Sequence, residues 1–328
     1  MFSKDIGIDL GTVNILVYVK GEGVVLNEPS VIVIDEESKR PIAFGKEAND
    51  MLGRTPGKIK AIKPMRDGVI ADFDSVEVLL DHLLKKIKAK RSFFKPRIVI
   101  CCPANITEVE KNAIAEVAAR SGAKRVFVEE EPKVAAIGAG LEINKPTGNM
   151  VIDIGGGTTD IAVLSLGDIV TSSSLKIAGD VMDADIIKFV KDKYKLLIGD
   201  RTAEQIKLEI GSAVKGSSDK TFEVRGRDLV TGLPHTITIT SNETELALRE
   251  TCATIVKETK HVLEQTPPEL AADIVSRGIF LTGGGALLTG LDRLLESELN
   301  VPVFVADDAL NCVANGCGVM LENLHYMK

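Results

Sequence analysis

Three short turns in the chain carry glycine directly after an apolar run. They lie at residues 11–12, 155–157 and 283–285. Glycine at such a turn lets backbone N–H groups approach an anion without a side chain in the way. Two of the turns follow an aspartate, Asp9 or Asp153, and a carboxylate would repel a phosphate unless a divalent cation lay between them. Because carboxylates at the ends of adjacent strands suit hydrated Mg²⁺ on nucleotide phosphates, the pattern predicts a magnesium–nucleotide site.

The two aspartate turns repeat one pattern. Residues 8–12 read Ile-Asp-Leu-Gly-Thr and residues 152–156 read Ile-Asp-Ile-Gly-Gly, so the aspartates are 144 positions apart (153 minus 9). One glycine turn alone is a weak signal, because an ordinary hairpin also contains one. The repetition favours an internal duplication of one lobe.

Other common sites are not found in the sequence. No P-loop motif is present, and no Gly-x-Gly-x-x-Gly run follows a strand and opens a helix. The four histidines are scattered and have no nucleophile motif beside them. Cys312 and Cys317 have no nearby histidine, which argues against zinc. The odd count of five cysteines favours a reducing cytoplasm.

Composition excludes several classes of protein. The 328 residues are 45% hydrophobic, which is too apolar for a disordered chain, and the length favours about two domains. The net charge of −7 argues against nucleic-acid binding. No apolar run is long enough for a membrane span, and we expect no signal peptide, because the first residues lead straight into a strand.

Alternating strands and helices must position the turns, which predicts an α/β protein. Capping-box spacing at Asp74/Glu77, Thr107/Glu110 and Thr202/Gln205 marks three helix starts. Strands are expected at 6–10, 15–19, 30–34, 97–102, 150–154, 161–166, 221–224, 235–240 and 278–282. Helices are expected at 74–90, 109–120, 132–141, 202–213 and 243–264.

Over its whole length the chain resembles the MreB-type bacterial actins, and most closely their Mbl-like branch. These proteins belong to the actin, sugar-kinase and heat-shock ATPase superfamily. The aspartate turns alone would give only the superfamily, and the other blocks are specific to MreB-like proteins. The matching blocks are DIGIDLGT at 5–12, GRTPG at 53–57, DGVIAD at 67–72, EEPKVAAIG at 130–138, DIGGGTT at 153–159, RGR at 225–227, TPPEL at 266–270 and LTGGGALL at 281–288.

This resemblance implies a two-lobed, actin-like ATPase fold of the α/β class, with ATP and Mg²⁺ in the cleft between the lobes. Each lobe would be built on a duplicated mixed β-sheet flanked by helices, with a smaller inserted subdomain. Lobe I is expected at residues 1–144 with its insertion at 33–72, and the C-terminal helix at 310–328 would pack back on it. Lobe II is expected at 145–309 with its insertion at 181–241.

The resemblance also implies the site residues. Glu131 would position the attacking water, with Thr158 as its hydroxyl partner, and Asp9 and Asp153 would hold the magnesium through water. The fit is physically sound, because water attacking a γ-phosphate needs orientation more than deprotonation. The nucleotide would contact Thr12, Val13, Asn14, Gly155, Gly156, Gly157, Thr158, Glu204, Gln205, Ile206, Lys207, Gly284, Gly285, Ala286 and Leu287.

Three of these positions leave another interpretation open or depart from the family pattern. As an acidic residue at a helix start, Glu131 could simply be favoured by the helix dipole. Val13 replaces the alanine that the family usually has in its first phosphate turn, a mild change if only the backbone N–H is used. Asp160 stands where many MreB members carry glutamate and Mbl-like ones aspartate.

A loop with two adjacent aromatic residues suggests a membrane contact. Phe93 and Phe94 are flanked by Lys90, Arg91, Lys95 and Arg97, which suits insertion into an anionic lipid surface. Loop aromatics more often pack inward, and it is the family resemblance that favours insertion here.

As a member of this family, the chain would be a slow cytoskeletal ATPase. It would polymerise with itself into protofilaments, which pair on the inner face of the cytoplasmic membrane and act with the cell-wall elongation machinery in rod cell shape. Two alternatives within the superfamily are weaker. A small-molecule kinase would need a base aimed at a hydroxyl, and only Glu131 offers one. A chaperone ATPase would need a substrate-binding domain after the last glycine turn, and we expect none.

Overall fold

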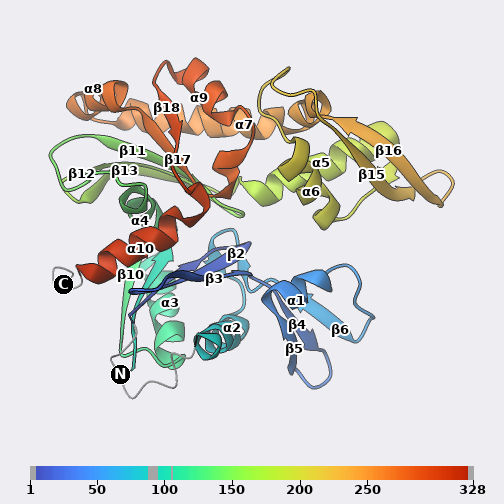
Figure 1. The fold of residues 1–328 in the computed structure, drawn as a ribbon, viewed down its shortest axis with the longest axis horizontal. Coiled ribbons are helices and arrows are strands. Elements are labelled where there is room, and N and C mark those ends of the chain that lie inside the picture. Colours follow the sequence, from blue (N-terminus) through green and yellow to red (C-terminus); the bar gives the residue numbers. More distant parts are fainter. Residues whose placement is uncertain (1–4, 88–94, 105, 324–328) are drawn as a thin grey trace.

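Two five-stranded sheets of matching topology form the body of the molecule (Figure 1). The computed structural model describes residues 5–87, 95–104 and 106–323. We call the sheet β10-β9-β1-β2-β3 and its helices lobe I, and the sheet β13-β12-β11-β17-β18 and its helices lobe II. In each sheet an antiparallel hairpin, β1–β2 or β11–β12, is extended by two parallel strands on one side and an antiparallel strand on the other. The repeated pairing agrees with the duplication that the two aspartate turns predict.

Lobe I begins at the N-terminus and includes the helices that cover its sheet. Val76, Leu79, Leu80 and Leu83 follow the helical spacing of α2, and all are buried in the lobe I core. The sheet strands and helices are β1 (Ile6–Leu10), β2 (Asn14–Val19), β3 (Gly23–Pro29), α2 (Phe73–Lys86), β9 (Arg97–Cys102), α3 (Glu108–Arg120), β10 (Arg125–Glu130) and α4 (Glu131–Gly138).

Lobe II continues with a sheet whose central strands are buried on both faces. Every residue of β11 and β12 is buried, as expected for strands covered by helices on each side. The elements are β11 (Asn149–Ile154), β12 (Thr159–Ser165), β13 (Asp168–Leu175), α5 (Gly179–Tyr194), α7 (Ser241–Gln265), α8 (Pro268–Arg277), β17 (Ile279–Thr282), the 3₁₀ helix η2 (Gly284–Leu287), α9 (Leu291–Leu299), β18 (Val303–Val305) and η3 (Ala309–Asn311). The last helix, α10 (Cys312–Glu322), packs on the lobe I sheet instead: a Cβ on Gly7 of β1 would lie 2.4 Å from Cys317 Cβ, and Lys20 Nζ donates to the Leu321 carbonyl at 3.0 Å.

Smaller sheets branch from each lobe on the same side of the molecule (Figure 1). A three-stranded sheet β5-β4-β6 and helix α1 extend lobe I, and a sheet β14-β15-β16 and helix α6 extend lobe II. Their bounds are β4 (Ile32–Asp35), β5 (Pro41–Phe44), α1 (Gly45–Asp50), β6 (Ile59–Ile62), the hairpin β7 (Met65–Arg66) and β8 (Val69–Ile70), β14 (Leu196–Leu197), α6 (Asp200–Ile210), β15 (Thr221–Asp228) and β16 (Pro234–Thr240).

Helices α4 and α10 approach each other closely beside the two main sheets. A Cβ on Gly138 would lie 1.8 Å from the carbonyl oxygen of Cys312, and one on Gly316 would lie 2.0 Å from that of Val134. Only glycine at both positions lets the two backbones touch. Residues of both helices, of β9 and of β11 share one buried cluster, so this helix pair joins the cores of the two lobes.

Several local predictions need correction. The first capping box is wrong, because Asp72 rather than Asp74 accepts the Ser75 N–H and α2 begins at Phe73. The third is also wrong, because α6 begins at Asp200 with no side-chain cap. Thr107 and Glu110 do form the predicted box. The helix after Glu130 ends at Gly138 rather than 141. Elements that the sequence does not predict include strands β3, β5, β6, β10, β13 and β18 and helices α5, α8 and α9.

Candidate functional site

The turns of the two central hairpins face each other across the boundary between the lobes. A Cβ on Gly156 would lie 2.0 Å from Val13 Cγ2, and one on Gly157 would lie 2.5 Å from Thr12 Oγ1. Glycine is therefore required wherever the second turn meets the first. Thr12 and Thr158 are buried, and Asn14 begins β2 directly after the first turn. The structure thus brings together the residues predicted to bind phosphates.

The second turn is held from two sides by backbone hydrogen bonds. Gly155 N–H donates to the Thr158 carbonyl at 2.9 Å, which closes the turn. The first residues of α5 then donate to the turn's carbonyls, Gly179 N–H to Gly155 at 3.2 Å and Asp180 N–H to Gly156 at 2.8 Å. With its carbonyls bonded in this way, the turn keeps one fixed shape.

The third glycine turn lies beside the end of β11, because β17 pairs with β11 in parallel. Thr282, the last residue of β17, donates a hydrogen bond from Oγ1 to Asp153 Oδ1 at 2.6 Å. The turn continues into η2, in which Ala286 is buried and Leu287 is 55% exposed. The side chain of Leu287 is thus available to a ligand, whereas that of Ala286 belongs to the lobe II core.

Helix α6 is tied to the phosphate turn through Lys207. Its ammonium donates to the Gly179 carbonyl at 2.9 Å and to Asp183 Oδ2 at 2.9 Å. Ile206 is fully buried in the lobe II core, so its side chain packs rather than lining a site. Glu204 is half-buried and Gln205 exposed. Among the predicted nucleotide residues of this helix, Glu204 and Lys207 have side chains at the boundary between core and solvent.

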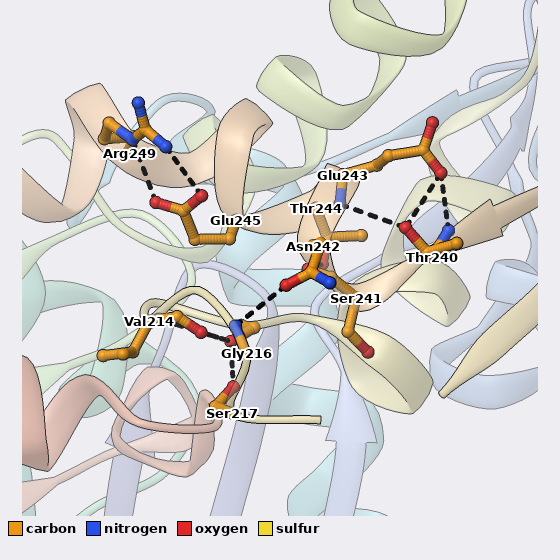
Figure 2. A network of polar contacts seen from close by, with 11 residues as sticks. Val214, Gly216, Ser217, Thr240, Ser241, Asn242, Glu243, Thr244, Glu245 and Arg249 are labelled. Atoms are coloured by element: carbon orange, nitrogen blue, oxygen red, sulfur yellow. Dashed lines mark hydrogen bonds and ion pairs between the residues drawn. The ribbon is translucent and has the colours of Figure 1, made fainter. Parts of the chain in front are cut away.

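The segment after α6 joins this helix to the third turn. Ser212 pairs with Thr289, and Ala213 N–H donates to the Thr289 carbonyl at 2.9 Å. Figure 2 shows how this segment is fixed to the start of α7: Gly216 N–H donates to Asn242 Oδ1 at 2.8 Å. Beside it, the Thr240 and Glu243 capping box fixes the first turn of α7. The network holds α6 and the third turn in one arrangement.

The carboxylates at the hairpin turns are costly to ionise in this structure. Burial raises the pKa of Asp9 to about 7, and the nearby Asp153 adds to this shift. Burial also raises the pKa of Asp153 to about 6, with a contribution from Asp160, although the Thr282 hydroxyl opposes it. Two such carboxylates would be stabilised as anions by a divalent cation.

The side chains at this site supply only some of the ligands that a magnesium ion needs. Within the described ranges, no three His, Cys, Asp or Glu side chains lie close enough to hold a metal ion directly. Mg²⁺ usually keeps several waters and takes one or two carboxylates plus substrate phosphates. Asp9 and Asp153 supply the carboxylate share of that set, so the residues fit a cation held through water and phosphate.

Glu131 and Thr158 come from opposite lobes. Glu131 is the first residue of α4 in lobe I, and Thr158 directly precedes β12 in lobe II; both are buried. Burial raises the pKa of Glu131 well above its usual value, and the Asp160 carboxylate is the charged group that adds most to the shift. A buried glutamate among carboxylates is an expensive arrangement, which favours a functional role over a simple helix-dipole contact.

Two features near these residues were not assigned from the sequence. Gly68 N–H donates to Thr12 Oγ1 at 3.0 Å, so the turn between β7 and β8 positions the first phosphate turn. Asp160 accepts the Ala104 N–H from the other lobe at 3.2 Å. The Asp-Gly pair at 67–68 could have signalled a turn. Nothing in the sequence could have shown what that turn contacts.

The predicted membrane residues Phe93 and Phe94 lie outside the described residues, as do 88–92. None of the described helices is long and apolar enough to cross a membrane.

Comparison with known proteins gives one consistent family. The family model described as MreB/Mbl protein matches residues 3–328. The chain is 60% identical to the cell shape-determining protein Mbl of Bacillus subtilis, over 99% of this chain and 97% of that protein. It is 53% identical to the cell shape-determining protein MreB of Escherichia coli, over 98% of this chain and 94% of that protein.

Solved structures agree with the fold. MreB5 of Spiroplasma citri bound to AMPPNP superposes with a TM-score of 0.94 at 41% identity, covering 99% of this chain and 98% of that one. A MamK double helical filament gives a TM-score of 0.84 at 22% identity, over 97% and 98% of the two chains, which supports the fold alone. The matched family model, the relatives and the shared fold all agree: the chain belongs to the MreB/Mbl family of actin-like proteins.

Proposed function

We propose that this protein is a cytoskeletal ATPase that binds ATP with Mg²⁺ between its lobes, polymerises, and hydrolyses ATP slowly. The observation that supports it most is the meeting of two phosphate-type turns at the boundary of two like sheets, where Asp9 before the first turn is half-buried and Asp153 before the second is buried. The related MreB5 structures hold AMPPNP and ADP, which supports the same ligand class here. The adenosine would lie between the end of α6 and the turn that contains η2.

Each group of residues at the site would have its own role in binding and hydrolysing ATP. Backbone N–H groups of residues 12–14 and 156–158 would bind the phosphates, while Gly155 keeps the turn closed, and Asp9 and Asp153 would hold the metal through its waters. Bound Mg²⁺ supplies charge neutralisation on the phosphates. Glu131 would accept a hydrogen bond from the attacking water while the Thr158 hydroxyl orients it from the other lobe. Because both groups must contact the same water molecule, hydrolysis would depend on the position of one lobe relative to the other.

In this proposal, slow ATP hydrolysis sets how long a filament lasts and does not serve a metabolic reaction. The names of the relatives, cell shape-determining protein Mbl and MreB, support a role in cell shape. Our proposal extends this role to rod shape and cell-wall synthesis on the inner face of the cytoplasmic membrane, as the family resemblance implies. Head-to-tail stacking uses two different faces of each subunit, and it grows as an open filament when the rotation between subunits does not close a ring.

High-speed sedimentation with ATP and Mg²⁺, paired with a phosphate-release assay, tests this proposal. The wild-type protein should pellet and release phosphate slowly. Glu131→Ala should pellet as well as the wild type but release phosphate on the order of 100-fold more slowly, because only water orientation is lost. Equal release by both proteins would remove Glu131 from its role.

A control addresses the kinase alternative. ATP consumption that rises with an added sugar, with no protein in the pellet, would favour a small-molecule kinase over the filament. Failure to pellet under any nucleotide condition would contradict the polymerising function itself.

A further inference from the structure

Asp160 is a buried carboxylate of lobe II that makes its hydrogen bond with lobe I. The side chain is fully buried, and its Oδ1 accepts the Ala104 N–H at 3.2 Å. Ala104 follows β9, in the segment of lobe I next to the boundary. Burying a carboxylate costs free energy unless hydrogen bonds replace those it made with water. A buried carboxylate at the boundary between the lobes therefore suggests a functional role.

The position of Asp160 relates it to Thr158. Thr158 ends the second glycine turn, and Asp160 is the second residue of β12, so a single residue separates the two in the chain. Burial raises the pKa of Asp160, and the Ser174 hydroxyl, the Ala104 N–H and the Thr158 hydroxyl oppose this rise. The Thr158 hydroxyl is thus within reach of the Asp160 carboxylate.

Lobe I encloses the same threonine from the opposite direction. A Cβ on Gly68 would lie 2.8 Å from Thr158 Cγ2 and 2.6 Å from Pro103 Cγ, so the turn at Gly68 touches both side chains. Pro103 immediately precedes Ala104. The Asp160–Ala104 hydrogen bond therefore closes a small ring of contacts around Thr158 that passes from one lobe to the other.

We propose that Asp160 is a positioning residue for ATP hydrolysis: by accepting the Ala104 N–H, it sets Thr158 of lobe II in register with Glu131 of lobe I. The inference rests on the proposed hydrolysis at this site. Glu131 and Thr158 can orient one water only when the lobes are correctly set, and small misplacements of orienting groups lower a rate steeply. The Asp160–Ala104 bond is the contact that couples lobe setting to that geometry.

The test compares Asp160→Ala with Asp160→Asn in the full chain. Alanine removes the acceptor, and we expect kcat for phosphate release to fall about tenfold or more, with KM for ATP and the Kd for ADP changed by less than about twofold. Asparagine keeps an oxygen acceptor for the Ala104 N–H and should restore most of the rate. Hydrogen exchange of the Ala104 amide should be slow in wild type and Asp160→Asn and fast in Asp160→Ala.

Thr251→Ala serves as the matched control. Its hydroxyl donates to Asp185 Oδ2 and joins α7 to α5 within lobe II, so this variant loses a buried hydrogen bond that does not cross between lobes. It should lower the melting temperature and leave kcat unchanged. A purely structural role for Asp160 would make Asp160→Ala behave in the same way.

Three outcomes would overturn the inference. The first is a wild-type rate in Asp160→Ala. The second is an equal loss in the alanine and asparagine variants with the Ala104 amide still protected, which would assign the effect to charge. The third, which needs no folded variant, is fast exchange of the Ala104 amide in wild type with AMPPNP bound. A wild-type protein that binds ADP but does not hydrolyse ATP would instead contradict the proposed function.

Discussion

At the scale of single residues, the paired aspartates impose an electrostatic cost that depends on pH. The pKa of Asp9 is raised to about 7 by burial and by Asp153, whereas its ordinary value is 3.8. The folded protein therefore holds this proton more tightly than the unfolded chain does. Between those two pH values the folded state binds more protons, so this group's contribution to stability falls as pH rises.

We expect Asp9→Asn to gain stability relative to the wild type as pH rises from about 4 to 7, by on the order of 2 kcal/mol in the free energy of unfolding. The physical reason is that asparagine does not ionise in the buried site. Urea unfolding of both nucleotide-free proteins at pH 5 and pH 7.5 measures the difference.

Asp168→Asn provides the reference for that comparison, because Asp168 is exposed at the start of β13. Its stability difference from the wild type should not change between the two pH values. A constant difference for Asp9→Asn as well would show that the site does not raise the pKa of Asp9.

At the scale of elements, capping side chains fix where the long helices begin. The Thr240 hydroxyl accepts the Glu243 N–H, and the Glu243 carboxylate accepts the N–H and the hydroxyl of Thr240 (Figure 2). Glu243 also accepts hydrogen bonds from Lys193 and Tyr194 of α5, which lower its pKa to about 2 against the effect of burial. This cap therefore fixes α7 and joins it to α5.

Thr240→Ala should lower the free energy of unfolding by about 1 kcal/mol, because it leaves the Glu243 N–H without its acceptor. Thermal or urea unfolding measures the loss. Thr240→Ser keeps the hydroxyl and should retain most of the stability, so an equal loss in both variants would mean that the methyl group, not the cap, is responsible.

Sequence patterns predicted that these helices exist, but they predicted the first and last residues of the helices less well. Capping-box spacing predicted the start of α3 correctly at Thr107, but it was misleading at Thr202, because α6 begins at Asp200 after Gly199. The box at Thr240 was missed. Spacing alone does not show which of several polar residues the backbone uses, since the choice depends on where the preceding strand ends.

In the candidate site, too, local features could be predicted from the sequence, whereas contacts between distant residues could not. The two glycine turns could be predicted because glycine and aspartate lie within a few residues of each other, and their binding of phosphate stays a prediction. The Asp160 bond to Ala104 and the Gly68 bond to Thr12 each join residues 56 positions apart. The first exists because the two lobes meet, and the second because the β7–β8 turn lies against the first glycine turn within lobe I. Sequence spacing carries no information on such contacts, so only the fold reveals them.

At the scale of the whole molecule, the proposed filament would bind to a lipid surface. We expect the double variant Phe93→Ala with Phe94→Ala to lose co-sedimentation with anionic liposomes, because the two rings supply the apolar part of the contact. Phe304→Ala is the control, since this phenylalanine is 48% exposed on β18, in the other lobe. Undiminished binding of the double variant would remove the loop from membrane attachment.

The matching strand order of the two sheets has a consequence for how one nucleotide is shared. Strands β9 and β17 are counterparts, since each runs parallel to the first strand of its hairpin. ATP has a base at one end only, so the loops that follow these two strands cannot both serve it. After β17 comes the glycine turn proposed for the adenosine, whereas after β9 comes Ala104, whose N–H donates to Asp160. A near-symmetric pair of sheets that binds one asymmetric nucleotide would therefore leave the segment after β9 without a ligand, and in this protein that segment joins the two lobes.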